Sequence, residues 1–336
     1  MGDVIMTLPV LKGVLTANSN VEIYLLTRKY LFPFFEGIEN LHLIEADLKN
    51  RHKGIKGLYR LFKEIRTEIK PDRVIDLHQV LRTYLLNIFF RISFTKVISF
   101  NKGSAEKKEQ VRKKSRKQLP DTITRYREAF EKAGFKVTLP DAPVLQQKTD
   151  KVFFEENFGV ITDNNTKLIG IAPFAQHKQK IWGEKKVEKL ITLIQENFNA
   201  KIFLFGGGKK EMDKLREIKE KFKNIFVSAD FYTLDKEIGL IGALDLMVSM
   251  DSANMHIAAL TGIPTISVWG GTHSSLGFAP YQQDKKNMIE YNGPKLTCRP
   301  CSVYGNKKCI YNTVKCMDYI SENQVFQRIS KILKNE

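Results

Sequence analysis

Charged side chains stand where short apolar runs end and amphipathic runs begin. Near the start, Asp3 precedes a helical pattern that has Pro9 in its first turn. This position suits an aspartate that caps the helix. It also suits a carboxylate that faces a ligand cleft and acts as a general base. One residue can fill both roles only if its side chain can turn toward the cleft.

A second candidate region, residues 173–182 (PFAQHKQKIW), places Lys180 just before a predicted helix. A cation beside a helix N-terminus suits a diphosphate, although a solvated basic loop shows the same pattern. Further along, three glycines at residues 206–208 open a helical pattern that carries Glu211. They do not complete G-x-G-x-x-G, so a tight strand-to-helix turn explains them better than a dinucleotide site.

The densest set of candidates lies in residues 249–271 (SMDSANMHIAALTGIPTISVWGG). Asp251 follows an apolar strand pattern, and Ser252 precedes a helical one. The first N–H groups of a helix have no partner within it, so an anionic ligand is favoured there. His256 lies one turn further in, and a single histidine on a helix is more often a packed core residue than a ligand.

Alternating apolar and amphipathic runs must position these side chains, and they are typical of βαβ units with parallel sheets. A first series predicts strands at residues 21–27, 41–45, 73–77 and 96–100, with a helix around residues 58–69. A second series predicts strands at residues 168–172, 201–205, 224–227, 246–249 and 265–269. Its predicted helices cover residues 184–198, 209–222, 233–243 and 252–260. Two such series predict an α/β chain of two doubly wound domains with a cleft between them, which binds ligands at the carboxyl ends of the strands.

The strand pattern fades between residues 140 and 165, so the domain boundary belongs there. We expect a first domain at residues 1–155, a second at residues 156–320, and a C-terminal helix at residues 321–336. Ser321 and Gln324 give that helix the pattern of a capping box.

Length, composition and charge limit the possible classes of protein. A chain of 336 residues suits two domains. Its 54 Lys and Arg exceed its 37 Asp and Glu by 17, which favours an anionic partner such as nucleic acid, anionic lipid or a phosphorylated sugar. The most apolar stretch, residues 84–94, is shorter than the roughly 20 residues of a membrane-spanning helix. With no signal-peptide pattern at its start, the sequence predicts a cytoplasmic protein.

All four cysteines fall in one segment, residues 298–316, with the spacing C-x2-C-x7-C-x6-C. In a cytosolic protein this clustering favours a structural metal over disulfides. Three alternatives stay open: a structural zinc, an iron–sulfur cluster, and thiols that are reduced or occasionally disulfide-bonded. The candidate metal ligands are Cys298, Cys301, Cys309 and Cys316. We assign no catalysis to them.

Two motifs together resemble the ADP-heptose:lipopolysaccharide heptosyltransferases, glycosyltransferase family 9. They are the opening MGDVIMTLPVL and the run DSANMHIAALTGIPTISVWGGT. Lys180 with Trp182, and the tail at Cys316 and Met317, are similar as well. The resemblance covers nearly the whole chain and implies a GT-B fold, with the acceptor site in the first Rossmann-like domain and the donor site in the second. It also implies inverting, metal-independent transfer of a sugar, with heptose from ADP-heptose as the expected donor, onto the lipid A or core region of lipopolysaccharide.

By position, Asp3 matches the catalytic base of this family, which would take the proton of the acceptor hydroxyl. Lys180 matches a lysine that contacts the donor diphosphate. It would offset the charge of the leaving group, so the resemblance implies that no cofactor is required for catalysis. The other residues that match donor-binding positions are Asp251, Ser252, Ala253, His256 and Glu211. The chain departs from the family where Ala253 replaces the usual glycine, and where Ala175 and Gln176 replace threonines.

The start of the chain is another departure, because family members carry a strand before the M-G-D motif. We expect the chain to lack this first strand. Its absence would leave a groove lined by unpaired backbone N–H and C=O groups.

Under this resemblance, the excess positive charge of the chain would bind an anionic acceptor, and basic residues of the first domain are the candidates. The expected acceptor-binding residues are Arg51, Lys53, Lys56, Arg60 and Lys63. Together with the basic segment at residues 102–117, expected in the same domain, they would face a phosphorylated lipid A or core acceptor and an anionic membrane surface. A solvated loop and an ordinary exposed helix face are the alternative. We therefore expect a protein that is peripheral to the inner membrane.

Two other classes of function compete with this one. A basic nucleic-acid-binding protein would fit the charge, but the chain shows no reader motif and no basic groove with interleaved aromatic residues. We therefore expect no specific nucleic-acid partner. The other class is an inactive or differently specific GT-B nucleotide-sugar enzyme, for example an epimerase.

Overall fold

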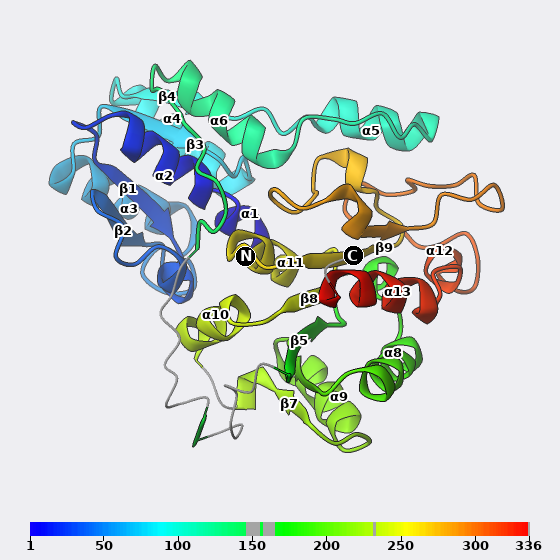
Figure 1. Cartoon of the computed structure of the whole chain (residues 1–336). Helices are drawn as coiled ribbons and strands as arrows, with labels where there is room; N and C mark the ends of the chain where they lie inside the picture. The colour runs from blue at the N-terminus through cyan, green and yellow to red at the C-terminus, as the bar shows by residue number, and fades with distance from the viewer. Residues whose placement is uncertain (146–154, 157–164, 231–232, 335–336) are drawn as a thin grey trace. The chain divides into compact units, whose positions relative to one another are not determined.

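The computed structural model describes residues 1–145, 155–156, 165–230 and 233–334. The chain divides into two compact units, which are described separately here (Figure 1). The first unit comprises Met1, Asp3–Ser104 and Pro120–Pro140, and the second comprises Gly2, Ala105–Leu119 and Asp141–Glu336. The predicted boundary between residues 155 and 156 lies beside residues outside the described ranges, so it stays a prediction.

The second unit is built on one six-stranded sheet. Its strands lie in the order β10-β9-β8-β5-β6-β7, and all neighbouring strands are parallel. Their bounds are β5 Lys167–Ala172, β6 Ala200–Leu204, β7 Ile225–Val227, β8 Leu246–Met250, β9 Thr265–Trp269 and β10 Met288–Glu290. Every residue of β8 and β9 is buried, as expected for central parallel strands covered on both faces.

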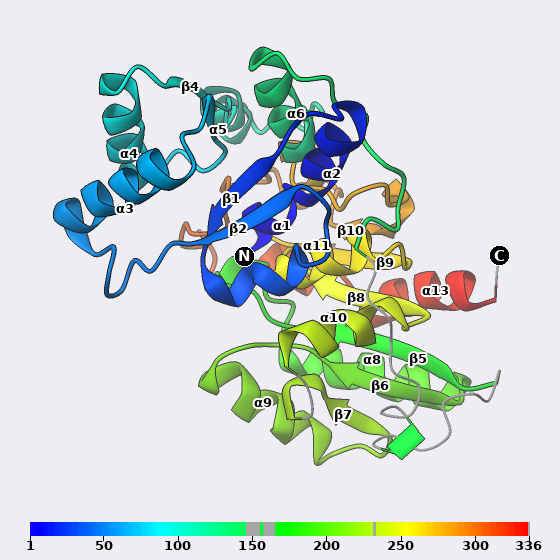
Figure 2. The ribbon, with the colours of Figure 1, turned by 90° about the vertical axis from the view of Figure 1, so that its left-hand side faces the viewer.

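Helices pack along this sheet, as Figure 2 shows. Both α11 and α13 contact β8 and β9, while α8 contacts β6 and α13. The helices of this unit are α5 Ser104–Lys113, α8 Glu184–Asn197, α9 Lys209–Lys219, α10 Leu234–Gly242, α11 Ala253–Leu260, α12 Lys315–Asp318 and α13 Glu322–Leu333. Strand β5 lies between β6 and β8, so the strand order reverses at β5, where ligands bind in sheets of this kind.

The first unit holds two separate parallel pairs of strands. Strand β1 (Ile23–Thr27) pairs with β2 (Leu41–Glu45), and β3 (Arg73–Asp76) pairs with β4 (Lys96–Ser99). Among the described residues no strand joins the two pairs. The helices of this unit are α1 Gly2–Ile5, α2 Leu8–Ala17, α3 Gly54–Glu68, α4 Leu81–Ile92 and α6 Thr122–Lys132. Part of the core lies between α3 and α4, where Leu61, Ile65, Leu86 and Phe90 pack together.

The strands predicted from the sequence are all present in the structure. The prediction missed β10, which has only three residues, and it also missed the helices α4, α5 and α6. In α4 the apolar residues do not keep to one helical face. Ser321 caps α13, because its hydroxyl accepts a hydrogen bond from the Gln324 N–H at 3.2 Å. This bond is the serine half of the predicted capping box.

One prediction about the basic segment at residues 102–117 is wrong. Most of it belongs to the second unit rather than the first. The Lys107 ammonium lies 4.2 Å from the centroid of the Phe278 ring, and the Leu119 N–H donates to the Ser275 carbonyl at 2.9 Å. Sequence position alone could not reveal this, because residues of the first unit precede and follow this segment in the chain. Within the described part of the chain, no helix has the length and apolar character needed to cross a membrane.

Asp76 fixes the turn that follows β3, and it provides a test of the first unit. Its Oδ1 accepts hydrogen bonds from the N–H groups of His78 and Gln79, both at 2.9 Å, and its Oδ2 accepts one from Asn87 Nδ2 at 2.7 Å. Asp76→Ala removes all three acceptors, so we expect the free energy of unfolding to fall by about 3 kcal/mol. Chemical denaturation followed by amide hydrogen exchange of α4 measures this. Asp72→Ala, at an exposed neighbour, is the control, and an equal loss in both variants would contradict the assignment.

Candidate functional site

Loops that follow β5, β8 and β9 bring the main candidate residues of the second unit together. Lys180 ends a short 3-10 helix (Lys178–Lys180) in the loop after β5, and Asp251 directly follows β8. Residues 270–272 follow β9. Because these strands are parallel neighbours, their carboxyl ends meet at one edge of the sheet.

Lys180 and Asp251 form an ion pair, with 2.9 Å between Lys180 Nζ and Asp251 Oδ2. The lysine side chain is 16% exposed and the aspartate side chain 5%. The same carboxylate oxygen accepts a hydrogen bond from Thr272 Oγ1 at 2.8 Å. Since desolvation offsets much of the attraction in a buried pair, the main effect of Asp251 is to fix where the ammonium group lies.

The backbone also ties the Lys180 loop to the turn after β9. The Gly271 N–H donates to the Gln179 carbonyl at 3.0 Å. A Cβ atom at Gly270 would lie only 2.1 Å from that carbonyl oxygen. The loops can approach this closely only because residue 270 is glycine.

Arg299, from the cysteine-containing segment, holds the turn after β9 from its other side. It is almost fully buried. It donates from Nε to the Gly270 carbonyl at 2.6 Å, and from Nη2 to the Thr272 carbonyl at 2.9 Å. Burial lowers the pKa of Arg299, while the Glu290 carboxylate, 3.4 Å away, acts in the opposite direction. The same segment supports Lys180 directly, because Gly305 leaves room for the lysine's methylene chain: a Cβ there would lie 2.9 Å from Lys180 Cγ.

Helix α11 begins beside this ion pair. Ser252 is its N-cap residue, but its hydroxyl makes no capping hydrogen bond and instead lies 3.2 Å from Ser249 Oγ. Ala253 is the first helical residue, so the N–H groups of the first turn belong to the region next to Asp251. His256 is buried within the helix, which agrees with the packed role considered for it from the sequence.

Glu211 lies at the carboxyl end of β6, in the first turn of α9. Its Oε2 accepts a hydrogen bond from the Gly207 N–H at 3.0 Å. Gly208 has a φ of 76°, so the glycine run forms the tight turn that the sequence predicted. The carboxylate therefore fixes the turn after β6, and its contact with a nucleotide stays a prediction.

Asp3 belongs to the first unit and is exposed. It lies inside α1, and Thr7 rather than Asp3 is the N-cap of α2, so capping of the predicted helix does not explain this aspartate. The Tyr126 hydroxyl donates a hydrogen bond to the backbone carbonyl of Asp3 at 3.2 Å, and not to its carboxylate. Burial raises the pKa of Tyr126 well above its usual value, and the Asp3 charge adds to this effect.

His78, which the sequence analysis missed, accompanies Asp3 in the first unit. Burial lowers the pKa of His78, while the negative charge of Asp3 raises it and the positive charge of Lys102 lowers it further. A neutral imidazole therefore lies within electrostatic range of the candidate base at neutral pH. Its position two residues after β3 was the available signal, since Asp251 also follows closely on a strand, β8.

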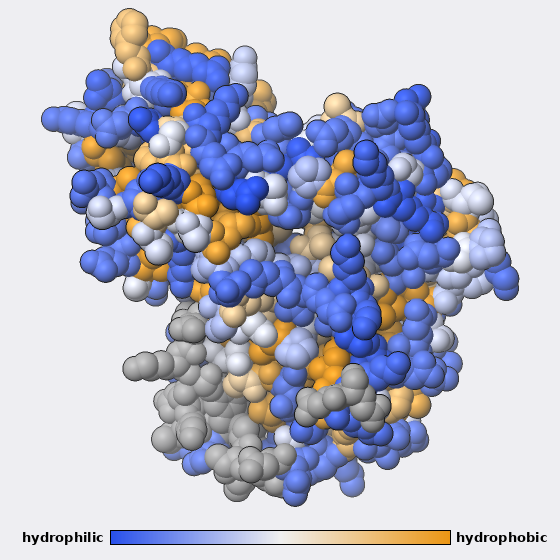
Figure 3. Space-filling model, turned by 45° about the horizontal axis from the view of Figure 1, so that its top comes forward, coloured by the Kyte–Doolittle hydropathy of each residue, from blue (hydrophilic) through white to orange (hydrophobic). Residues whose placement is uncertain are grey.

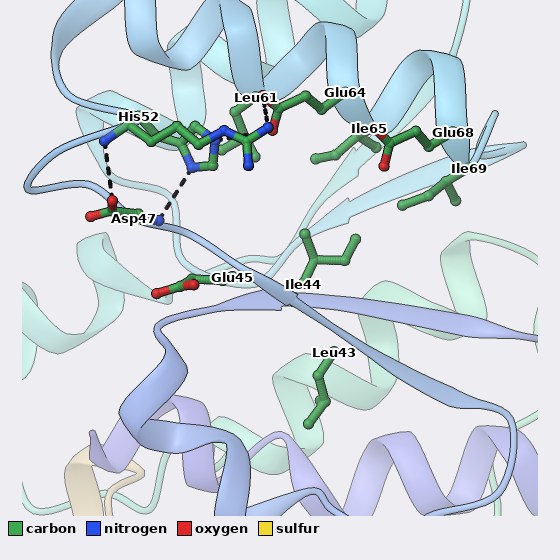
Figure 4. A pocket seen from close by; sticks show the side chains of 11 residues that line it. Leu43, Ile44, Glu45, Asp47, His52, Leu61, Glu64, Ile65, Glu68 and Ile69 are labelled. Atoms are coloured by element: carbon green, nitrogen blue, oxygen red, sulfur yellow. Dashed lines mark hydrogen bonds and ion pairs between the residues drawn. The ribbon is translucent and has the colours of Figure 1, made fainter.

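The acceptor-binding candidates lie on and before α3, and only Arg51 lines a pocket that α3 forms with β2 (Figure 4). This pocket has a volume of about 400 Å³. Its charged lining is mostly acidic, and it comprises Glu45, Asp47, Arg51, His52, Glu64 and Glu68. Arg51 pairs with Glu64 at 2.7 Å, so the pocket is unsuited to phosphates. The other candidates, Lys53, Lys56, Arg60 and Lys63, are exposed.

A structural zinc was one of three alternatives for the four cysteines, and it stays a prediction. All are free thiols, and among the residues that the structure describes no three His, Cys, Asp or Glu side chains are arranged to hold a metal ion. Burial raises the pKa of the Cys301 thiol, and it raises that of Cys316 to about 11. Cys301 contacts Gln179 and Gly271, so it helps to hold the Lys180 loop.

Comparison with known families gives a match over most of the chain. The family model described as "Glycosyltransferase family 9 (heptosyltransferase)" matches residues 58–308. Lipooligosaccharide heptosyltransferase 2 of Campylobacter jejuni is 26% identical over 184 residues, which are 52% of this chain and 54% of that protein. The match thus spans about half the length of this relative. Lipopolysaccharide core heptosyltransferase OpsX of Haemophilus influenzae is 23% identical over 90% of this chain and 86% of that protein.

Solved structures share the fold over the whole chain. A glycosyl transferase family 9 structure from Veillonella parvula has a TM-score of 0.73 and 22% identity, and the match covers 100% of this chain and 95% of that one. The E. coli heptosyltransferase WaaC, solved with ADP, has a TM-score of 0.66 and 17% identity, with 98% and 96% covered. This likeness identifies the fold as GT-B.

The close approach at Gly270 gives a test of how the site is built. Gly270→Ala forces a methyl group against the Gln179 carbonyl, so the two loops must separate. We expect the free energy of unfolding to fall by about 2 kcal/mol, measured by chemical denaturation. The control is Gly207→Ala, where a Cβ meets nothing within 4 Å. Unchanged stability in Gly270→Ala would show that the loops are not held together as described.

Proposed function

The chain belongs to glycosyltransferase family 9, the heptosyltransferase family, and from this premise we propose that it transfers heptose from ADP-heptose onto the core of lipopolysaccharide. Membership of the family makes it a glycosyltransferase. The ADP named for the E. coli structure and the lipopolysaccharide core named for the Haemophilus relative support the choice of donor and acceptor.

One observation carries the donor half of the proposal: an ammonium group held by a buried carboxylate beside the start of a helix. Lys180 is fixed by Asp251, and the first N–H groups of α11 lie next to that aspartate. A diphosphate binds well to a lysine and to helix N–H groups together. Ser252 and Ala253 then contribute backbone N–H groups, and Glu211 contacts the nucleotide ribose.

The proposed reaction is a single displacement that inverts the anomeric centre. Asp3 removes the proton from the acceptor hydroxyl, and the hydroxyl oxygen attacks the anomeric carbon of the donor sugar. The bond between that carbon and the diphosphate oxygen breaks, and ADP leaves. Lys180 offsets the negative charge that develops on ADP, which is the task that a metal ion performs in other enzymes, so the reaction needs no metal.

The acceptor half of the proposal rests on charge. Lys53, Lys56, Arg60 and Lys63 are exposed on and beside α3, and they attract the phosphate groups of a lipid A or core acceptor. Arg51, which lies in the mostly acidic pocket beside Glu64, contributes less. Because this acceptor is anchored in a bilayer, we place the enzyme in the cytoplasm at the surface of the inner membrane. Its other partners are the nucleotide sugar and the anionic lipid, and no specific nucleic acid.

Asp3→Asn tests the assignment of the base. We expect transfer to fall by about 10²-fold to 10⁴-fold, which is the usual contribution of general-base catalysis. ADP binding should be unchanged, and it is measured by the rise in melting temperature with added ADP. Equal loss of transfer and of ADP binding in Asp3→Asn would make Asp3 structural.

The same measurement on the unaltered chain, with ADP, ADP-heptose, UDP and UDP-sugars, tests the donor. A rise in melting temperature with UDP compounds alone would reassign the donor.

A further inference from the structure

Helix α4 is apolar on two opposite faces, although only one of them packs in the core. Leu86 and Phe90 are buried against α3, whereas Leu81 is 77% exposed and Ile92 is 71% exposed. Tyr84 is exposed beside them. This is the most apolar stretch of the chain, and the proposed reaction makes no use of it. A helix at the surface of a globular protein normally keeps its apolar residues on the face that packs in the core.

The turn after α4 extends this surface. Phe94 is 99% exposed and has a φ of 61°, in the left-handed region where glycine is the usual residue at the end of a helix. Its N–H donates to the Arg91 carbonyl at 3.1 Å. A phenylalanine here gains no packing and adopts an unfavourable backbone conformation, so glycine would serve the fold better. The packing and the backbone conformation of the folded chain therefore give no reason for a phenylalanine at this position.

Helix α3 continues the same surface. Ile55 and Tyr59 are exposed, and the ring centroids of Tyr59 and Phe89 of α4 lie 5.4 Å apart, edge to face. This contact joins the outer surfaces of the two helices. We define the α3–α4 face as the exposed residues Ile55, Tyr59, Leu81, Tyr84, Ile92 and Phe94. Figure 2 shows the two helices side by side, and in Figure 3 apolar side chains protrude at the upper left, over the first unit.

Basic residues surround this face, and acidic residues lie elsewhere. Lys56, Arg60 and Lys63 of α3 and Arg82 and Arg91 of α4 are all exposed. Lys63 Nζ lies 5.2 Å from the centroid of the Tyr59 ring. The acidic residues of α3, Glu64 and Glu68, line the pocket that α3 forms with β2 (Figure 4). Helix α4 carries no acidic residue.

We propose that the α3–α4 face binds the surface of an anionic lipid bilayer, with its apolar side chains in the interface and its lysines and arginines at the headgroups. Exposed apolar residues surrounded by positive charge favour this partner, because the apolar groups gain by burial and the cations by attraction. Tyrosines are enriched at this depth of a bilayer. The inference rests on the proposed function in one respect, since a lipid-anchored acceptor makes such a surface useful. A protein partner or a second copy of the chain is the competing occupant.

Vesicle binding tests the proposal without any substrate. The full chain should sediment with vesicles of phosphatidylglycerol and phosphatidylethanolamine in equal parts, and not with phosphatidylcholine vesicles. Leu81→Gln with Ile92→Gln and Phe94→Gly should weaken this binding at least tenfold. Phe94→Gly alone should weaken it while leaving the melting temperature unchanged or higher, because glycine suits the left-handed turn. Ile310→Gln, equally exposed in the second unit, is the matched control and should bind normally.

A tryptophan at residue 94 reports the depth of insertion. The two natural tryptophans, Trp182 and Trp269, are both buried in the second unit, so they contribute a constant background. Phe94→Trp should shift its emission to the blue and be quenched by brominated lipid in the phosphatidylglycerol vesicles. Ile310→Trp should show neither change.

These outcomes separate the proposal from the proposed function. Normal vesicle binding by the triple variant, or an unquenched tryptophan at residue 94, would overturn the membrane assignment. So would a dimer that the triple variant dissociates in solution without lipid. Transfer to a detergent-dispersed acceptor should survive in the triple variant. If the unaltered chain transfers no sugar yet binds vesicles through this face, the proposed function fails and the membrane assignment stands.

Discussion

The ion pair between Lys180 and Asp251 is the interaction on which the candidate donor site depends. A lysine side chain is long and flexible, so a diphosphate site built on it needs something to hold the ammonium group. Asp251 does this from the end of β8, at 2.9 Å. Thr272, from the end of β9, holds the same carboxylate oxygen. Three neighbouring parallel strands thus contribute one residue each, and the sheet sets their spacing before any ligand binds.

The segment that contains the four cysteines holds the loops around the Lys180–Asp251 ion pair in place. Arg299 binds the carbonyls of Gly270 and Thr272, and Gly305 accommodates the methylene chain of Lys180. Cys301 contacts the same loops, and burial disfavours thiolates at Cys301 and Cys316. The segment therefore gives shape to the candidate donor site through packing and backbone hydrogen bonds.

Sequence patterns correctly predicted those elements whose structure depends on residues close together in the chain. The buried runs of β8 and β9 and the N-terminal start of α11 follow directly from apolar residues and turn residues, and they place Asp251 and Ser252 correctly at a strand end and a helix start. Sequence patterns did not predict contacts between residues that lie far apart in the chain. The pairing of Lys180 with Asp251, the burial of Arg299, and the packing of residues 105–119 on the second unit all join residues far apart in the chain. Helix α4 was missed because its second apolar face faces outward.

The affinity of the Asp251→Asn variant for ADP tests the central claim most directly. Asparagine keeps the shape and can keep the Thr272 contact, but it removes the charge that holds Lys180. Isothermal titration calorimetry with ADP and with adenosine separates the diphosphate contribution from the rest. If the carboxylate positions the lysine, ADP should bind at least about tenfold more weakly, a loss of about 1.4 kcal/mol, while adenosine binding is unchanged. If Asp251 were only a negative charge near the diphosphate, its removal would strengthen ADP binding, and that result would contradict the account.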